Sequence, residues 1–167
     1  MSDDLTKVHV ELPNHWGTGG ESLWARPLGD DLYQLDNVPF YAYGLNYGDV
    51  VRATEDAPNL KPEIREVARP SGHQTIRVFF ETGVAEGTMM ALLATLKPLA
   101  VSFERATERF FALDLEPHVD LMTIRGVLDD WERKGAASYE TCEARIPGSF
   151  DDAPQLQNDG HEGPEAP

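Results

Sequence analysis

The most constraining feature of the sequence is the way hydrophobic residues change their spacing between residues 74 and 146. Alternation, which is typical of strands, begins at Ile76 and returns in two segments within residues 100–116 and in a last segment at 138–146. Helical spacing of three and four residues follows the first strand and recurs from Val119 to Trp131. The order β-α-β-β-α-β predicts a ferredoxin-like unit over residues 73–146, in which two helices cover one face of a four-stranded antiparallel sheet.

The two faces of the first predicted strand differ in character. Ile76, Val78 and Phe80 would face the helices, because successive side chains in a strand point to opposite sides. The other face would carry His73, Thr75, Arg77 and Phe79. This open face must meet water, the N-terminal half or a ligand, so it is the first place to search for a function.

The N-terminal half, residues 1–72, consists of short β-rich segments separated by turn signals. Apolar and polar residues alternate at 7–12, and further segments span 22–28, 31–38, 39–44 and 49–54. Gly29, Pro39 and Gly48 mark the turns and strand starts between them. We expect a small curved antiparallel β-sheet or partial barrel here, and the whole chain is predicted to belong to the α+β class.

The C-terminal residues 147–167 differ in composition from the rest of the chain. They contain five acidic residues, no Lys or Arg, and only Phe150 and Leu156 as large apolar groups. Such a segment cannot bury enough apolar surface to offset the entropy of ordering it. We therefore expect a disordered acidic tail.

The net charge of −15 limits the partners that this chain can attract. It opposes binding to nucleic acid and to anionic membranes, whereas a basic protein would be attracted. The most apolar window, residues 89–101, is too short to span a membrane and is interrupted by Lys97 and Pro98. The acidic start is not typical of a secretory signal, and Cys142 has no second cysteine to pair with. We expect a cytoplasmic protein.

Several motifs together resemble a known bacterial family. They are Trp24, the run Asp-Asn-Val-Pro-Phe at 36–40, Gly-Asp-Val-Val at 48–51, and Ser-Gly-His at 71–73 followed by Arg77. On these residues the chain resembles the family catalogued as domain of unknown function 4265, over about residues 21–145. The resemblance implies no activity, because none is attached to the family's name.

The aromatic segment at residues 37–51 has two interpretations. It can be a strand that closes a small barrel, since aromatic residues are ordinary strand formers. Alternatively, Tyr41 and Tyr43, which would point to the same side of that strand, form an exposed surface for stacking or for contact with a partner.

The segment at residues 69–77 is the stronger candidate for chemistry. Gly72 permits a close turn between Ser71 and His73, and Arg77 lies further along the same strand face as His73. Arg77 and exposed amides could bind a carboxylate or a phosphate. In the alternative, Arg77 forms an ion pair with Asp114 or Glu140 and His73 caps a loop.

No motif predicts a cofactor or a metal. The segment at residues 15–22 resembles a phosphate-binding loop but lacks the final Gly-Lys-Ser/Thr. The five histidines show no spacing typical of zinc ligands, and the acidic pairs lack the pattern of a calcium loop. We expect no cofactor and no metal.

Two functions remain open from the sequence. The first is an interaction protein, of an immunity or regulatory type, that captures a basic partner through its negative field. The second is an enzyme or a small-anion sensor with a site between the two halves around Ser71, His73 and Arg77. The absence of a catalytic motif favours the binding protein over the enzyme.

Overall fold

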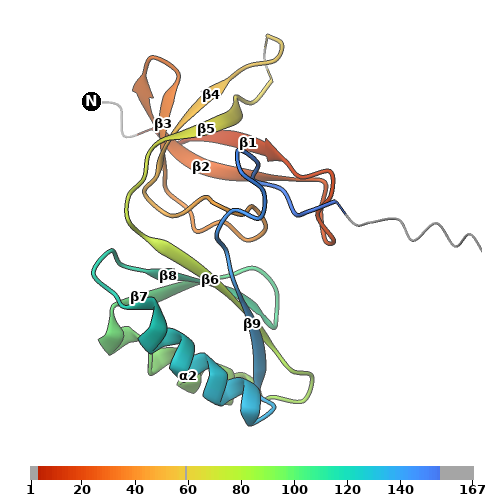
Figure 1. The fold of residues 1–167 in the computed structure, drawn as a ribbon, viewed down its shortest axis with the longest axis vertical. Helices are drawn as coiled ribbons and strands as arrows, with labels where there is room; N and C mark the ends of the chain where they lie inside the picture. The colour runs from red at the N-terminus through yellow and green to blue at the C-terminus, as the bar shows by residue number, and fades with distance from the viewer. Residues whose placement is uncertain (1–3, 59, 155–167) are drawn as a thin grey trace, which may run out of the picture.

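A computed structural model describes residues 4–58 and 60–154 as two stacked units (Figure 1). The N-terminal unit is a closed barrel of five strands. Its strands are β1 (Thr6–Glu11), β2 (Gly20–Gly29), β3 (Leu32–Leu35), β4 (Val50–Thr54) and β5 (Glu63–Arg69). Each strand pairs antiparallel with the next, and a short parallel contact between β1 and β5 at His9 and Glu63 closes the barrel.

Alternating side chains of the barrel strands, with Leu12, Ala42 and Leu45 from the connections between them, form the core of the barrel. The buried residues of this core are Val8, Val10, Leu12, Leu23, Ala25, Leu35, Ala42, Leu45, Val51, Ala53 and Ile64. In β1 and β2 these are every second residue, because one face of each strand lies inside the barrel.

The second unit is a four-stranded antiparallel sheet with two α-helices. Its elements are β6 (Gln74–Phe80), α1 (Glu86–Ala94), a 3-10 turn η1 (Lys97–Leu99), β7 (Val101–Arg105), β8 (Phe110–Leu115), α2 (Leu121–Arg133) and β9 (Ala137–Thr141). The strand order across the sheet is β7-β8-β6-β9. Figure 1 shows the helices on one side of this sheet and the barrel on the other.

The helices bury the apolar face of the second sheet. Met89 and Leu93 of α1, with Ile124, Leu128 and Trp131 of α2, share one core with alternate residues of β6 and β8. Asp120 caps α2 by accepting a hydrogen bond from the Met122 N–H at 3.2 Å, as its sequence position before the apolar repeat favours. The apolar residues that repeat with helical spacing in the sequence are therefore the ones that the helices bury against the sheet.

The mixed α and β content and the second sheet with two helices are confirmed, and the N-terminal strands, which were expected to form a curved sheet or partial barrel, form a closed barrel. The predicted strand at residues 39–44 is wrong, because the structure has no strand between Leu35 and Val50. The backbone groups of residues 39–42 bind side chains from two other strands, as described below, so they do not join a sheet.

The packed part of the chain extends beyond residue 146. Phe150 packs against the barrel core, and its carbonyl accepts a hydrogen bond from the Tyr43 N–H at 2.8 Å. Asp151 is buried and accepts a hydrogen bond from the Asn14 N–H at 2.7 Å. Phe150 and Asp151 of the predicted tail thus pack on the N-terminal unit, while residues 155–167 are outside the described residues.

Within the described residues, no helix is both long enough and apolar enough to cross a membrane.

Candidate functional site

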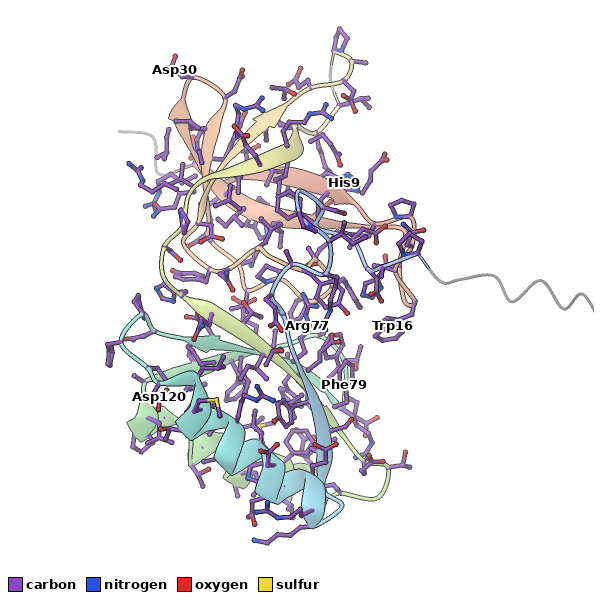
Figure 2. All side chains as sticks on the ribbon, in the orientation of Figure 1. His9, Trp16, Asp30, Arg77, Phe79 and Asp120 are labelled. Carbon is purple, nitrogen blue, oxygen red and sulfur yellow. The ribbon has the colours of Figure 1, made fainter. Side chains whose placement is uncertain are left out.

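Arg77 is completely buried where β6 meets the barrel. The residue is 0% exposed, and Figure 2 shows it between the two units. The guanidinium donates to the carbonyl of Pro39 at 3.4 Å, to that of Tyr41 at 3.1 Å and to that of Ala42. Glu140, opposite Arg77 on β9, lies 3.5 Å away and balances its charge. The predicted ion pair of Arg77 is therefore present, with Glu140 as the partner.

Glu21 binds the same loop from the barrel side. Its buried carboxylate accepts hydrogen bonds from the N–H groups of Phe40 at 2.6 Å, Tyr41 at 2.8 Å and Ala42 at 3.1 Å. Burial raises the pKa of Glu21, and the three N–H groups and Arg77 oppose this shift. Residues 39–42 are thus bound through their N–H groups by an anion and through their carbonyls by a cation.

Tyr43 belongs to the same network. The residue is 2% exposed, and its ring centroid lies 5.0 Å from the guanidinium carbon of Arg77 and 4.4 Å from that of Arg145. Its hydroxyl donates to Glu140 at 3.1 Å. Burial, followed by the charge of Glu140, raises the pKa of this hydroxyl. Tyr43 therefore contacts neighbouring side chains within the protein, whereas Tyr41 is half-buried.

Ser71 lies in the connection from β5 to β6, opposite the turn before β4. The buried carboxylate of Asp49 accepts hydrogen bonds from the N–H groups of Asn46 and Ser71, both at 2.9 Å. The Ser71 hydroxyl donates to the carbonyl of Tyr47 at 2.6 Å and accepts from the His73 N–H at 3.1 Å. The hydroxyl of Ser71 is thus bonded to the backbone on both sides.

Gly48 allows the turn before β4 to approach Ser71, and Gly72 allows the β5–β6 connection to approach Pro117. Both have positive φ angles, +80° and +88°, which residues with a Cβ adopt at a cost. A Cβ at Gly48 would lie 3.2 Å from the Ser71 Cβ, and a Cβ at Gly72 would lie 3.2 Å from the Pro117 Cβ. The Gly-Asp-Val-Val and Ser-Gly-His motifs therefore pack against each other where Gly48 faces Ser71, and the absence of a side chain at Gly48 makes this close contact possible.

His73 and Asp114 form a pair at the start of β6. His73 Nδ1 lies 2.8 Å from Asp114 Oδ1, and the imidazole contacts the ring of Tyr47 with a centroid distance of 5.3 Å. Burial raises the pKa of Asp114, and the hydrogen bond from His73 opposes that shift. Next to them, the Thr75 hydroxyl donates to the Asn46 side chain at 2.9 Å, which joins β6 to the barrel.

The five residues predicted as a site thus divide between two networks. Ser71 and His73 belong to the network around Asp49 and Asp114, whereas Tyr43 and Arg77 belong to the network around Glu21 and Glu140. Tyr41 contributes its N–H and carbonyl to the second network. Both networks connect the barrel to the second sheet.

Two buried carboxylates in these networks, Glu21 and Asp49, were missed by the sequence analysis. A signal existed for Glu21, because it occupies the same strand face as the buried Leu23 and Ala25. An acidic residue at an apolar position of an alternating strand indicates a buried acceptor. Asp49 offers no comparable pattern.

Aromatic side chains line one side of the junction. The rings of Phe79 and Phe110 stack with a centroid distance of 4.5 Å, and Tyr41 packs on Phe110 at 5.7 Å. Trp16, in the loop between β1 and β2, reaches Phe79 at 6.1 Å and remains 60% exposed (Figure 2). The barrel therefore presents an exposed tryptophan beside the second unit.

Metal and thiol chemistry have little support in the described part of the chain. No group of three or more His, Cys, Asp or Glu side chains there could hold a metal ion. Cys142 is buried, and this burial raises the pKa of its thiol to about 12, so the reactive thiolate is scarce at neutral pH.

The fold and the junction define a class of protein in which a small barrel is joined to a helix-covered sheet by buried carboxylates and one buried arginine. The chain belongs to the family described as Domain of unknown function (DUF4265), whose model matches residues 21–139. That range includes Glu21, Asp49, Ser71, His73 and Arg77 of the junction, whereas Glu140 and Arg145 lie just beyond it.

A solved structure has a similar fold. It is the crystal structure of a hypothetical protein from Neisseria gonorrhoeae, which matches with a TM-score of 0.68 and 16% sequence identity. The match covers 83% of this chain and 95% of that one. At this identity the likeness shows the fold alone. No curated protein matches the chain in sequence.

Proposed function

We propose that the protein is a binding module of an immunity or regulatory type, whose partner is a basic protein. The observation that supports this most is the burial of Arg77, whose N–H groups bind backbone carbonyls and Glu140. An anionic ligand would have to displace these contacts. What remains accessible is a surface of strongly negative charge with an exposed Trp16.

The net charge of −15 favours such a partner kinetically as well as energetically. A field of one sign steers an oppositely charged protein toward the surface and raises the association rate by about 10 to 10³ at low ionic strength. Exposed tryptophans are common anchors of such interfaces. The proposal includes a cytoplasmic setting, in which the single thiol of Cys142 stays reduced.

We also propose that the second unit, beginning at residue 73, is ferredoxin-like. The strand order β9-β6-β8-β7, the antiparallel pairing of each neighbour and the placement of both helices against one face support this assignment. In this arrangement the face that carries Thr75, Arg77 and Phe79 packs against the barrel. The helix-covered face and the two sheet edges are then left for partners.

The alternative function, an enzyme or small-anion sensor at Ser71, His73 and Arg77, has less support. The hydroxyl of Ser71 is bonded to backbone groups on both sides. The described hydrogen bond from His73 to the Ser71 hydroxyl comes from the backbone N–H, whereas the His73 imidazole is bonded to Asp114. No described contact brings these two side chains and Arg77 together.

The test is affinity capture from native host cells by the full chain, followed by intact-mass analysis of everything that elutes with it. We expect a stoichiometric basic protein that dissociates at high salt. Capture of a stoichiometric small anion, with no protein partner, would overturn the proposal. A Trp16→Ala variant then tests the tryptophan beside Phe79, and a Trp24→Ala variant, at another exposed tryptophan of the barrel, is its control.

A further inference from the structure

Strand β7 is an open edge of the second sheet. Among the described strands it pairs with β8 alone, and it ends the order β7-β8-β6-β9. One side of β7 therefore presents backbone N–H and carbonyl groups with no strand beside them. Such an edge is a template on which an extended segment of another protein can add as a further strand.

An apolar groove of about 340 Å³ lies along the helix side of this edge. It is lined by Met90, Leu93 and Ala94 of α1, by Lys97 of η1, and by Val101, Ser102 and Phe103 of β7. Phe103 is 40% exposed, which is unusual for a phenylalanine on the core side of a sheet. The groove can accept apolar side chains from a strand that pairs with β7.

The side of α1 that faces solvent is also poor in charge. Beyond Glu86, its exposed residues are small and uncharged: Gly87, Thr88, Ala91 and Ala94. In a chain of which 26% is charged, this helix face carries one charged residue, the acidic Glu86, and the one charged residue that lines the groove is Lys97.

The barrel side of β7 is acidic. Glu104 is half-buried there, and its carboxylate accepts a hydrogen bond from the Val38 N–H at 3.3 Å. Among the described residues, no Lys, Arg or His side chain lies within 4.0 Å of it. Burial raises the pKa of Glu104, and the nearby charges of Asp114 and Asp36 raise it further. This carboxylate lacks the countercharge that a partner could provide.

We propose that the edge of β7 binds an extended segment of the basic partner, in which apolar and basic residues alternate. Successive side chains of a strand point to opposite faces. One set would therefore enter the groove beside Phe103 and Met90, while the other set would place Lys or Arg beside Glu104. This inference rests on the proposed function and specifies where its partner binds.

The probe is a blocked synthetic peptide that repeats Val-Lys five times, titrated into the full chain by calorimetry and by NMR. Two control peptides are a Val-Glu repeat of equal length and a peptide of the same composition with all Val before all Lys. We expect the alternating basic peptide to bind most tightly and to shift the amide resonances of β7. No binding, or equal binding of the three peptides, would overturn the inference.

Two variants locate the site, each with a matched control. Glu104→Gln removes the charge but keeps an oxygen for the Val38 N–H, and its control is Glu66→Gln on exposed β5. Phe103→Thr empties the rim of the groove while keeping a strand-forming residue, and its control is Leu28→Thr, at an exposed leucine of β2.

We expect each β7 variant to weaken peptide binding about tenfold and each control to change it less than about twofold. Thermal melts establish whether the variants are folded. If Phe103→Thr is unfolded, the test rests on Glu104→Gln alone. Equal effects of variants and controls would contradict the inference. If the native chain forms a dimer and Phe103→Thr dissociates that dimer, the edge of β7 binds a second copy of the chain. That result would also overturn the inference.

The two proposals fail separately. A basic partner captured from cells that binds Glu104→Gln and Phe103→Thr normally would disprove the β7 site but keep the proposed function. The absence of any basic partner would disprove the proposed function itself.

Discussion

Glu21 and Arg77 bind the same four-residue loop from opposite sides. The carboxylate of Glu21 accepts hydrogen bonds from the N–H groups of Phe40, Tyr41 and Ala42, while the guanidinium of Arg77 donates to carbonyls of the same loop. Glu21 comes from β2 of the barrel and Arg77 from β6 of the second sheet. The loop therefore connects the two units without forming a strand itself.

Glu21→Gln should destabilise the protein by about 1 to 3 kcal/mol, because a neutral amide cannot accept three N–H hydrogen bonds as a carboxylate does. Urea unfolding measures this change. Glu66→Gln, at an exposed position of β5, is the control and should change the unfolding free energy by less than about 0.5 kcal/mol. Equal stability of the two variants would show that the loop does not depend on Glu21.

Glu104→Gln should stabilise the free protein at pH 7. Burial, with Asp114 and Asp36 nearby, raises the pKa of Glu104 in the folded state, so its ionisation opposes folding. The stabilising contribution of this group is present below the ordinary Glu pKa of 4.5 and is lost as pH rises through the raised value. Urea midpoints of the two proteins should therefore differ at pH 7 and converge near pH 4.5. A lower midpoint for the variant at pH 7 would contradict this account.

Trp131→Ala should cost about 3 to 5 kcal/mol of stability, because it removes a large buried ring and leaves a cavity. Trp131 is buried in the second core and stacks against Phe80 with a centroid distance of 6.0 Å. Met122→Ala, an exposed position on the same helix, is the control. A Trp131 variant as stable as this control would place the ring outside the core.

Asp151→Ala should destabilise the barrel by about 1 to 3 kcal/mol, since it leaves the Asn14 N–H without its acceptor. Asp152→Ala is the matched control, because Asp152 accepts only from the N–H of the next residue among its described hydrogen bonds. The melting temperatures of the two variants give the comparison. If Asp151→Ala lowers the melting temperature no more than Asp152→Ala does, the segment after residue 146 does not anchor the loop before β2.

The helices and most strands could be predicted from the sequence because their signals are local. Met89 and Leu93, or Ile124 and Leu128, lie one turn apart and pack on one core, so spacing alone identifies them. The strand predicted at 39–44 failed for a different reason. Its alternating aromatic pattern is real, but its backbone partners are Glu21 and Arg77, which lie about twenty or more residues away in either direction.

The candidate site could likewise be predicted only in part. The face of β6 that was predicted to be open carries Arg77, and Glu140 was one of the two ion-pair partners considered for it. The burial of that face against the barrel could not be read from one strand, because alternation distinguishes two faces but does not show what covers each. The acidic environment of Glu104 depends on Val38 and Asp36 from another unit, which sequence spacing does not reveal.

The most direct test of the account measures stability and binding on one variant, Arg77→Met. If Arg77 joins the units and takes no part in binding, the variant loses about 3 to 5 kcal/mol of unfolding free energy, because Glu140 and three carbonyls lose their partner. The fraction that stays folded at low temperature should bind the Val-Lys peptide with the affinity of the native protein. A variant that keeps its full stability but no longer binds its partner would contradict the account.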